Sequence, residues 1–291
     1  MARAGRRDRR VGTMAQVGSG LPEREAAAAQ REHRTHAELR QTPADVLIIG
    51  SQVVYGTVGM SAALPVLHRE GLHVLAVPTI VLSAMPHYAN YHAVPHDAGW
   101  LADTLNDLVV LGLVDEITTI ATGYFATADQ VEVVADWLRR IRLSHPHITV
   151  VVDPTIGDYD VGVYTAPGID AALRDHLVPL ATGLVPNAFE FSHLTDQADD
   201  PVAAARAMLG EYGQWVVVTS HEVAGETVTD LIITRDNTTR VDNPLVPTGV
   251  KGAGDVYAAA LVAGLHNKMT LVDAATHAAT TVYAGLTARA L

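Results

Sequence analysis

Small residues and an aspartate gather late in the chain, in the stretch TGVKGAGDVYAAALVAGL at 248–265. Gly252, Ala253 and Gly254 precede an alanine-rich run that predicts a buried helix, so their backbone N–H groups would converge at its N-terminus. Free donors and the helix dipole favour an anion there. Asp255 follows in the first turn, where it could simply complement the dipole beside a tight turn. An anion hole beside a carboxylate is also what phosphoryl transfer to a hydroxyl requires.

Other chemistries are excluded by motifs that the chain lacks. The P-loop motif G-x-x-x-x-G-K-[ST] is absent, and GSQVVYGTVG (50–59) lacks the G-x-G-x-x-G spacing of a dinucleotide fingerprint. There is no G-x-S-x-G motif, and Ser220 and His221 are neighbours on a predicted strand, so their side chains would point apart. The absence of cysteine excludes disulfides and thiol catalysis.

Charge divides the 291-residue chain into two unequal parts. Residues 1–42 carry nine arginines and five acidic residues, whereas the whole chain has a net charge of −12. The Arg-rich start, poor in large apolar residues, predicts a disordered or poorly ordered basic tail. The acidic remainder argues against nucleic-acid binding, because phosphate backbones require clustered Lys and Arg. No apolar run approaches the ~20 residues needed to span a membrane.

From residue 45 onward, short β-branched runs alternate with longer helical patterns. Continuous apolar strands separated by helices predict an α/β fold with a mostly parallel sheet covered on both faces. Ligands of such sheets bind beyond the carboxyl ends of the strands. The predicted strands are 45–50, 73–79, 116–123, 148–154, 182–187 and 215–220; the predicted helices are 59–71, 100–114, 127–145 with Thr127 as N-cap, 200–212, 254–266 and 270–289; residues 227–246 predict a hairpin or meander.

Five stretches together resemble the ribokinase-like superfamily and, within it, the pyridoxal kinase family. They occur in the expected order within residues 45–290, and their combination is more specific than any one of them. The resemblance implies a three-layer αβα sandwich with a central, mostly parallel sheet, and one kinase domain over residues 43–291. The stretches are SQVVYGTVG (51–59), VVDPTIGD (151–158), VPNAFE (185–190), VVVTS (216–220) and GAGDVYAAALVAGL (252–265).

The same resemblance implies an activity. Members of the family transfer the γ-phosphate of ATP to the 5′-hydroxymethyl group of pyridoxal, pyridoxine or pyridoxamine. They use Mg²⁺ and often a monovalent cation such as K⁺, and they form homodimers. We therefore expect a cytoplasmic homodimer that acts on small molecules, without a nucleic-acid or membrane partner.

Site residues follow from the matched motifs position by position. Asp255 corresponds to the general base, and Gly252, Ala253 and Gly254 to the anion hole. Asp153 and Glu190 correspond to residues that organise Mg²⁺, partly through water. The nucleotide positions are Asp158, Tyr164, Asn187, Thr219 and Ser220, and the acceptor positions are Ser51, Val53, Ser83, His87 and Tyr124. Taken singly, Asp153, Asn187, Ser51 or Thr219 could each be structural.

Lys251 precedes the anion hole and stands outside the matched motif. An ammonium group there could neutralise the γ-phosphate as a flexible point charge. A lysine on a solvated loop is an equally simple interpretation, so we expect the kinetics of Lys251→Ala to distinguish the two.

The acceptor side departs from the family pattern more than the nucleotide side. Gln52, Met60 and Ala253 replace other residues of the family, and the SAMPHY loop (83–88) has Ala84, Met85 and Pro86 where polar residues are usual. The same loop carries His87, His92 and His96, but the prolines among them and the lack of cysteine argue against a zinc site. We expect instead that His87, Tyr88 or Tyr91 contacts the substrate.

Two alternatives stay open at this point. One is a kinase of the same fold for another hydroxymethyl substrate, such as a hydroxymethylpyrimidine, although those kinases generally have cysteine where Asp255 stands. The other is a non-catalytic protein that binds pyridoxal phosphate. The joint presence of Asp153, Glu190 and Asp255 argues against it, because a binding protein needs no base.

Overall fold

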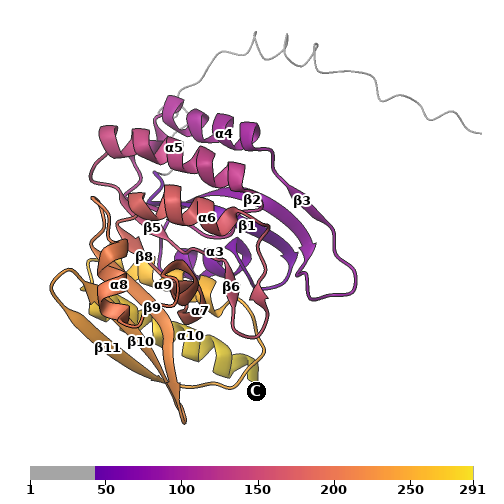
Figure 1. Cartoon of the computed structure of the whole chain (residues 1–291). Coiled ribbons are helices and arrows are strands. Elements are labelled where there is room, and N and C mark those ends of the chain that lie inside the picture. Colours follow the sequence, from indigo (N-terminus) through magenta and orange to yellow (C-terminus); the bar gives the residue numbers. More distant parts are fainter. Residues whose placement is uncertain (1–42, 291) are drawn as a thin grey trace, which may run out of the picture. The chain divides into compact units, whose positions relative to one another are not determined.

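The computed structural model describes residues 43–290, and the tail predicted for residues 1–42 lies outside the described residues. A nine-stranded sheet runs through this part of the chain in the order β11-β10-β9-β8-β5-β4-β1-β2-β3 (Figure 1). The inner strands are parallel: β1 (Val46–Tyr55), β2 (Val74–Ala84), β4 (Thr119–Thr122), β5 (Thr149–Val152), β8 (Gly183–Leu184) and β9 (Trp215–Ala224). The antiparallel edge strands are β3 (Ala93–Pro95), β10 (Thr227–Thr234) and β11 (Thr238–Pro244).

Helices cover both faces of this sheet, each over its own hydrophobic core (Figure 1). One face carries α4 (Ala98–Val110), α5 (Ala128–Ser144), α6 (Ile169–Ala172), α7 (Ala188–Leu194) and α8 (Pro201–Met208). The other carries α3 (Met60–Arg69), α9 (Ala253–His266) and α10 (Leu271–Ala290). Short helical turns lie at Leu113–Asp115, Leu173–Leu177 and Val178–Leu180. The predicted three-layer αβα sandwich is therefore confirmed.

A small hairpin outside the main sheet is formed by β6 (Gly157–Asp158) and β7 (Gly162–Val163). We call this hairpin, residues 157–163, the flap. Its turn packs on α7, because the rings of Tyr159 and Phe189 meet edge to face with their centroids 5.5 Å apart. Periodicity predicted neither the hairpin nor α7, since both are too short to show a hydrophobic period, although the family resemblance places Tyr164 on a segment like a mobile flap over ATP.

Most predicted elements are present, and the predicted N-cap is confirmed because the Thr127 hydroxyl accepts a hydrogen bond from Gln130 N at 3.3 Å. Strand β9 continues to Ala224, past its predicted end at residue 220. Two neighbouring strands are also longer than predicted: β1 continues to Tyr55 and β2 to Ala84. Their extensions pair with each other from Ser51–Ile80 to Tyr55–Ala84, beyond the end of β4. The polar residues of SQVVY therefore belong to a strand that leaves the buried part of the sheet.

Two glycines allow the loop after β1 to meet the start of α9. Gly252 has φ +95°, and a Cβ there would lie 1.8 Å from the carbonyl oxygen of Thr57. Gly59 has φ +56°, and a Cβ there would lie 2.2 Å from Ser51 Oγ. Only glycine permits both the left-handed backbone and the close approach. The two loops therefore fix each other, and with them the position of Asp255.

This contact predicts that alanine substitutions at two neighbouring glycines change the free energy of unfolding by different amounts. Gly252→Ala should lower the free energy of unfolding by about 3 kcal/mol, because it adds left-handed strain and overpacking against Thr57. Gly254→Ala is the matched control, since a Cβ there meets nothing within 4 Å. Urea unfolding of both variants measures the difference, and equal stabilities would show that the contact does not constrain the loop.

Candidate active site

A cavity of 340 Å³ opens beyond the carboxyl ends of β1 and β2. Its wall is mainly apolar with a few polar groups, as in small-molecule sites. Four of the predicted acceptor residues line this cavity: Ser51, Val53, His87 and Tyr124. Four other predicted site residues line it as well: Asp158, Tyr164, Lys251 and Asp255. The rest of the lining is formed by Val58, Gly59, Leu82, Pro86, Thr155 and Val161. The flap thus supplies one side of the cavity and the SAMPHY loop another.

A smaller cavity of 110 Å³ adjoins it and is polar. It unites the predicted metal and phosphate residues Asp153, Asn187, Glu190, Thr219, Gly252 and Gly254, with Thr155, Tyr164, Val185 and Asp255. Asp255, Thr155 and Tyr164 line both cavities. Asp255 therefore stands where the larger, apolar space meets the smaller, acidic one.

A third cavity of 190 Å³ lies on the other side of the α9 N-terminus. Thr219 and Gly254 line both this cavity and the polar one, while Ser220 and Ala253 face only this space. The rest of its wall is mostly apolar and comes from β10, the segment after β11, α9 and α10: Val228, Asp230, Asn243, Pro244, Leu245, Val246, Tyr257, Ala279, Val282, Tyr283 and Leu286. The three spaces form a series around the first turn of α9.

Carboxylates around the polar cavity perturb one another. Burial, and next the charge of Asp153, raises the pKa of Asp255 to about 7. Burial and the same charge raise the pKa of Glu190 to about 8, and burial raises the pKa of Asp153. Displaced pKa values of this kind are typical of functional sites, where a base must titrate near neutral pH.

Backbone donors hold these carboxylates in place. The Asp153 carboxylate accepts hydrogen bonds from Thr155 N (3.0 Å) and Thr155 Oγ1 (2.9 Å). Glu190 Oε1 accepts from Ile156 N at 2.8 Å and its Oε2 from Asn187 N at 3.0 Å. Asp153 Oδ1 and Glu190 Oε1 each accept two hydrogen bonds, because Gly157 N also donates to Glu190 Oε1 at 3.4 Å, so the other oxygen of each carboxylate is the better placed to bind a cation.

Asn187 serves as the N-cap of α7. Its Oδ1 accepts a hydrogen bond from Glu190 N at 2.9 Å and its Nδ2 donates to Gly157 O at 2.9 Å. Together with the Glu190 contact to Asn187 N, this forms a capping box. Asn187 and Glu190 thus have a structural role, and they tie α7 to the start of the flap.

The carboxylates fit a Mg²⁺ ion that keeps several waters. Within residues 43–290, no three His, Asp or Glu side chains converge as a complete metal site. Mg²⁺ is ordinarily bound by one or two carboxylates, waters and substrate phosphates, so a complete protein cage is not required. A divalent cation beside Asp153 and Glu190 would relieve the repulsion that raises their pKa values.

Lys251 ties the flap to the anion-hole loop. Its Nζ lies 2.8 Å from Asp158 Oδ2 and 2.7 Å from Asp160 Oδ2. Lys251 is the one lysine or arginine among the described residues that line the three cavities. Its ammonium group sits in ion pairs at the cavity wall, 24% exposed, instead of standing free in solvent.

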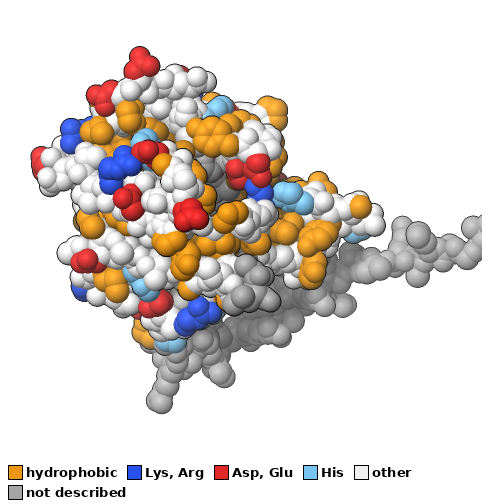
Figure 2. Space-filling model, turned by 90° about the horizontal axis from the view of Figure 1, so that it is seen from below, with side chains coloured by type: hydrophobic (Ala, Val, Ile, Leu, Met, Phe, Trp, Pro, Cys, Tyr) orange, Lys and Arg blue, Asp and Glu red, His pale blue; other side chains and the backbone are white. Residues whose placement is uncertain are grey.

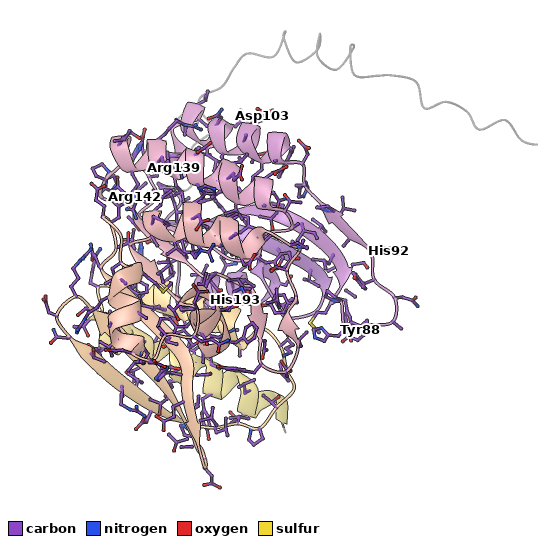
Figure 3. The ribbon with its side chains drawn as sticks, viewed as in Figure 1. Tyr88, His92, Asp103, Arg139, Arg142 and His193 are labelled. Carbon is purple, nitrogen blue, oxygen red and sulfur yellow. The ribbon has the colours of Figure 1, made fainter. Side chains whose placement is uncertain are left out.

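The structure separates Ser83 from the other acceptor residues. Its hydroxyl accepts a hydrogen bond from His92 N at 2.8 Å and steadies the β2–β3 connection instead of lining the large cavity. Alternation along β2 explains this, because Leu82 faces the cavity and the next side chain faces away. Within SAMPHY, Pro86 and His87 reach the cavity; Tyr88 lies farther out on the same connection with His92 (Figure 3).

Residues that depart from the family pattern mostly lie behind the cavity wall. Gln52 Nε2 donates to Ser61 Oγ at 2.8 Å, and Met60 is buried in the core. Sequence reasoning missed Thr155 and Asp160, although both stand in the matched segment around VVDPTIGD, two positions from a predicted aspartate.

Comparison with known proteins agrees with this arrangement. Residues 55–290 match the phosphomethylpyrimidine kinase family. The pyridoxine/pyridoxal/pyridoxamine kinase of Bordetella bronchiseptica is 42% identical over 257 residues, which cover 85% of this chain and 90% of that protein. A pyridoxal kinase of Rubrobacter xylanophilus is 33% identical over 250 residues, covering 83% of this chain and 86% of that protein.

Solved structures show the same likeness. The pyridoxal kinase of Leishmania donovani in complex with ADP and pyridoxine has a TM-score of 0.77 and 27% identity, over 84% of this chain and 90% of that one. The pyridoxal kinase of Entamoeba histolytica has a TM-score of 0.79 at 22% identity, over 85% and 90% of the two chains, and shows the likeness of fold.

Fold and site together define a kinase with a three-layer αβα architecture, in which the Asp255 carboxylate stands between an apolar cavity and a polar cavity at the N-terminus of α9. More narrowly, the chain belongs to the phosphomethylpyrimidine kinase family and, within it, to the pyridoxal kinases. The resemblance inferred from the motifs is thereby confirmed.

The raised pKa of Asp255 predicts a cost to stability. Its folded pKa of about 7 exceeds the ordinary value of 3.8, so stability is lost as pH rises between those values and the loss is complete above pH 7. Asp255→Asn should therefore raise the Tm of the ligand-free protein at pH 8, by about 3 °C or more, and should change it little at pH 4. Thermal scans at both pH values measure this.

The matched control for that experiment is Asp103→Asn, on the exposed surface of α4 (Figure 3). It should leave Tm unchanged at pH 8. An Asp255→Asn variant no more stable than wild type at pH 8 would contradict the raised pKa.

Proposed function

We propose that the protein is an ATP-dependent kinase that phosphorylates the 5′-hydroxymethyl group of pyridoxal, pyridoxine or pyridoxamine to give pyridoxal 5′-phosphate or its analogues, as in vitamin B6 salvage. The observation that carries the proposal is the place of Asp255, which lines both the acceptor-sized cavity and the polar cavity at the α9 N-terminus. The relatives at 42% and 33% identity, a pyridoxine/pyridoxal/pyridoxamine kinase and a pyridoxal kinase, support the same acceptors.

In this proposal the acceptor lies in the larger cavity with its hydroxymethyl group toward Asp255. Ser51 and Tyr124 offer polar groups to the ring, while Val53, Leu82 and Pro86 pack on its faces. Ser51 is almost buried, so its hydroxyl is held within the wall. Apolar walls with few polar groups fix the orientation of a small aromatic ring. His87 closes the cavity from the SAMPHY loop.

The triphosphate of ATP then extends through the polar cavity. Asp255 takes the proton of the acceptor hydroxyl while the hydroxyl oxygen forms a bond to the γ-phosphorus. The bond between the β–γ bridging oxygen and the γ-phosphorus breaks, and ADP is released. Backbone N–H groups of Gly252, Ala253 and Gly254 stabilise the charge of the transferring group. The nucleoside lies in the third cavity beside Thr219 and Ser220, which makes these residues ATP-binding.

Asp153 and Glu190 would hold the Mg²⁺ of Mg-ATP, partly through water, and when bound this ion neutralises phosphate charge. Asn187 holds Glu190 through the capping box, and Asp158 and Tyr164 complete the wall between nucleotide and acceptor. A monovalent cation such as K⁺ remains part of the proposal only by family resemblance.

A second acceptor class is favoured by one observation, the match to a family described as phosphomethylpyrimidine kinase. A hydroxymethylpyrimidine has the same ring size and the same reacting group as a B6 vitamer. The more similar relatives are B6 kinases, so the pyrimidine remains the alternative.

Turnover with defined acceptors tests the proposal. Mg-ATP is incubated with pyridoxal, pyridoxine, pyridoxamine, hydroxymethylpyrimidine or ribose, and ADP is followed. We expect ADP formation with the B6 vitamers, and kcat/KM that rises with pH to a plateau above about pH 7, because the pKa of Asp255 is raised to about 7 and this base must be deprotonated to act. Turnover with the pyrimidine alone moves the assignment to that substrate.

Asp255→Asn should abolish turnover while ADP still binds, since the amide cannot accept the proton. Binding is measured by calorimetry. A variant that keeps near-normal rates would refute the base assignment, and a wild type that binds pyridoxal phosphate but turns over none of the acceptors would indicate a binding protein.

Lys251 provides a separate prediction. In the ternary complex, its ammonium group should exchange its ion pairs with Asp158 and Asp160 for a contact with the γ-phosphate. Lys251→Ala should therefore lower kcat by about 10- to 100-fold. Asp160→Asn should change kcat less than threefold, because Asp158 still holds the ammonium group. Lys268→Ala is the matched control, on an exposed turn. An unchanged kcat for Lys251→Ala would refute the phosphate role.

We also infer a homodimer through the protruding β2–β3 connection. Val54, Tyr55 and Val94 are 76%, 66% and 63% exposed, and the rings of Tyr55 and Tyr88 lie 5.6 Å apart. Figure 2 shows hydrophobic and histidine side chains together on the lobe at the right, where Figure 1 places this connection. Light scattering of wild type and Val94→Lys tests the assembly, and a monomeric wild type would refute it.

No helix in the described part of the chain is long and apolar enough to span a membrane. A cytoplasmic location remains a prediction, for which fractionation of cells that express the chain is the direct measurement.

A further inference from the structure

Strand β9 is interrupted beside the third cavity, the 190 Å³ space in which the nucleoside would lie and which we call the nucleotide cavity. Its pairing with β10 joins Val218 to Leu231 and then Glu222 to Thr229, so residues 219–221 lie opposite the single residue Asp230. Such a bulge leaves backbone groups without their ladder partners and redirects the strand. Ser220, at the centre of the bulge, has φ +50°, in the left-handed region that side-chain-bearing residues seldom occupy.

Asp230 supplies the partner that the ladder does not. Ser220 N donates a hydrogen bond to Asp230 Oδ1 at 2.8 Å. The Asp230 side chain is buried, with the residue only 4% exposed, so this bond is shielded from water. The preceding residue is held separately, because Thr219 N donates to Pro186 O at 2.9 Å. The Thr219–Ser220 turn is therefore fixed at two consecutive N–H groups.

The same carboxylate borders α9. Burial, and then the neighbouring Asp230, raises the pKa of Tyr257, which lies two residues after Asp255. Asp230, Ser220 and Tyr257 all line the nucleotide cavity, and Thr219 lines both this cavity and the polar one. Asp230 thus contacts the turn that joins the two spaces in which the nucleoside and the phosphates would lie.

We propose that Asp230 is a positioning residue for ATP: it holds Ser220 in its left-handed conformation and thereby sets Thr219 and Ser220 against the nucleotide. The inference rests on the proposed ATP-dependent function, and it assigns Asp230 no contact with the acceptor or with the transferring phosphate. A purely structural residue would affect stability and both substrates alike. A positioning residue for the turn affects the nucleotide selectively.

Three substitutions test this. Asp230→Leu keeps the branched shape of the side chain but cannot accept a hydrogen bond, and it should raise KM for ATP and the Kd for ADP about tenfold, with KM for pyridoxal and kcat changed less than twofold. Asp230→Asn keeps an accepting oxygen and should stay within threefold of wild type. Thr229→Val, on the same buried strand, is the control and should leave the Kd for ADP unchanged.

A glycine at position 220 separates positioning from direct contact. Glycine adopts φ +50° without strain, so the effect of Asp230→Leu on the Kd for ADP should fall from about tenfold to less than threefold in a Ser220→Gly background. An undiminished effect would overturn the proposal in favour of direct contact between Asp230 and the nucleotide. Equal increases in both KM values would overturn it in favour of a general structural role.

Calorimetric ADP binding needs no acceptor, so these results do not depend on which alcohol the enzyme phosphorylates. Failure of the proposed function appears as a wild type that binds ADP without turnover of any acceptor. Failure of this inference appears as an unchanged Kd for ADP in Asp230→Leu. If Asp230→Leu does not fold, Asp230→Ser replaces it, since its shorter side chain cannot reach Ser220 N, and the same thresholds apply.

Discussion

Electrostatic repulsion among three carboxyl groups is the constraint on which the site depends. Asp153, Glu190 and Asp255 line one cavity of 110 Å³; burial raises the pKa values of all three, and the charge of Asp153 raises those of Glu190 and Asp255 further. A fold selected for stability alone would not place them together. The surrounding backbone makes the arrangement tolerable, because Thr155, Ile156, Gly157 and Asn187 each donate a hydrogen bond to Asp153 or Glu190.

Sheet geometry brings these groups together and glycine sets their separation. Asp153 follows β5 and Asn187 follows β8, two adjacent parallel strands whose carboxyl ends lie at one edge. Asp255 lies on α9, in a helical layer on one face of the sheet, and the contact of Gly252 with Thr57 sets how closely the start of α9 approaches the strand ends. Asp153 and Asn187 come from strand ends and Asp255 from the start of a helix, so residues from all three layers meet at the polar cavity.

Sequence reasoning succeeded where local chemistry determines the structure. Periodicity located the layers, and the glycine-rich motif placed Asp255 at a helix N-terminus. It was less successful where pairing between distant segments decides the outcome. The extension of β1 and β2 depends on their contact with each other, and this pairing turns Ser83 away from the cavity. Likewise, in the sequence Asp230 is one polar residue within a predicted strand. Its hydrogen bond from Ser220 N forms only when β9 and β10 pair.

Ion pairs attach the outer part of the flap to the rest of the site, whereas Gly157 at its start is held by hydrogen bonds to Asn187 and Glu190. Lys251 bridges to Asp158 and to Asp160, whose side chain is 61% exposed, and the flap's exposed side chains include Tyr159, Val161 and Val163. Opening the flap would therefore break ion pairs near solvent while leaving the two hydrophobic cores packed, so it costs much less than unfolding. Such pairs weaken as ionic strength rises and the Debye length shrinks to about 3 Å at 1 M salt. Salt therefore weakens the ion pairs that hold the flap beside the acceptor cavity, while the two hydrophobic cores that stabilise the fold are little affected.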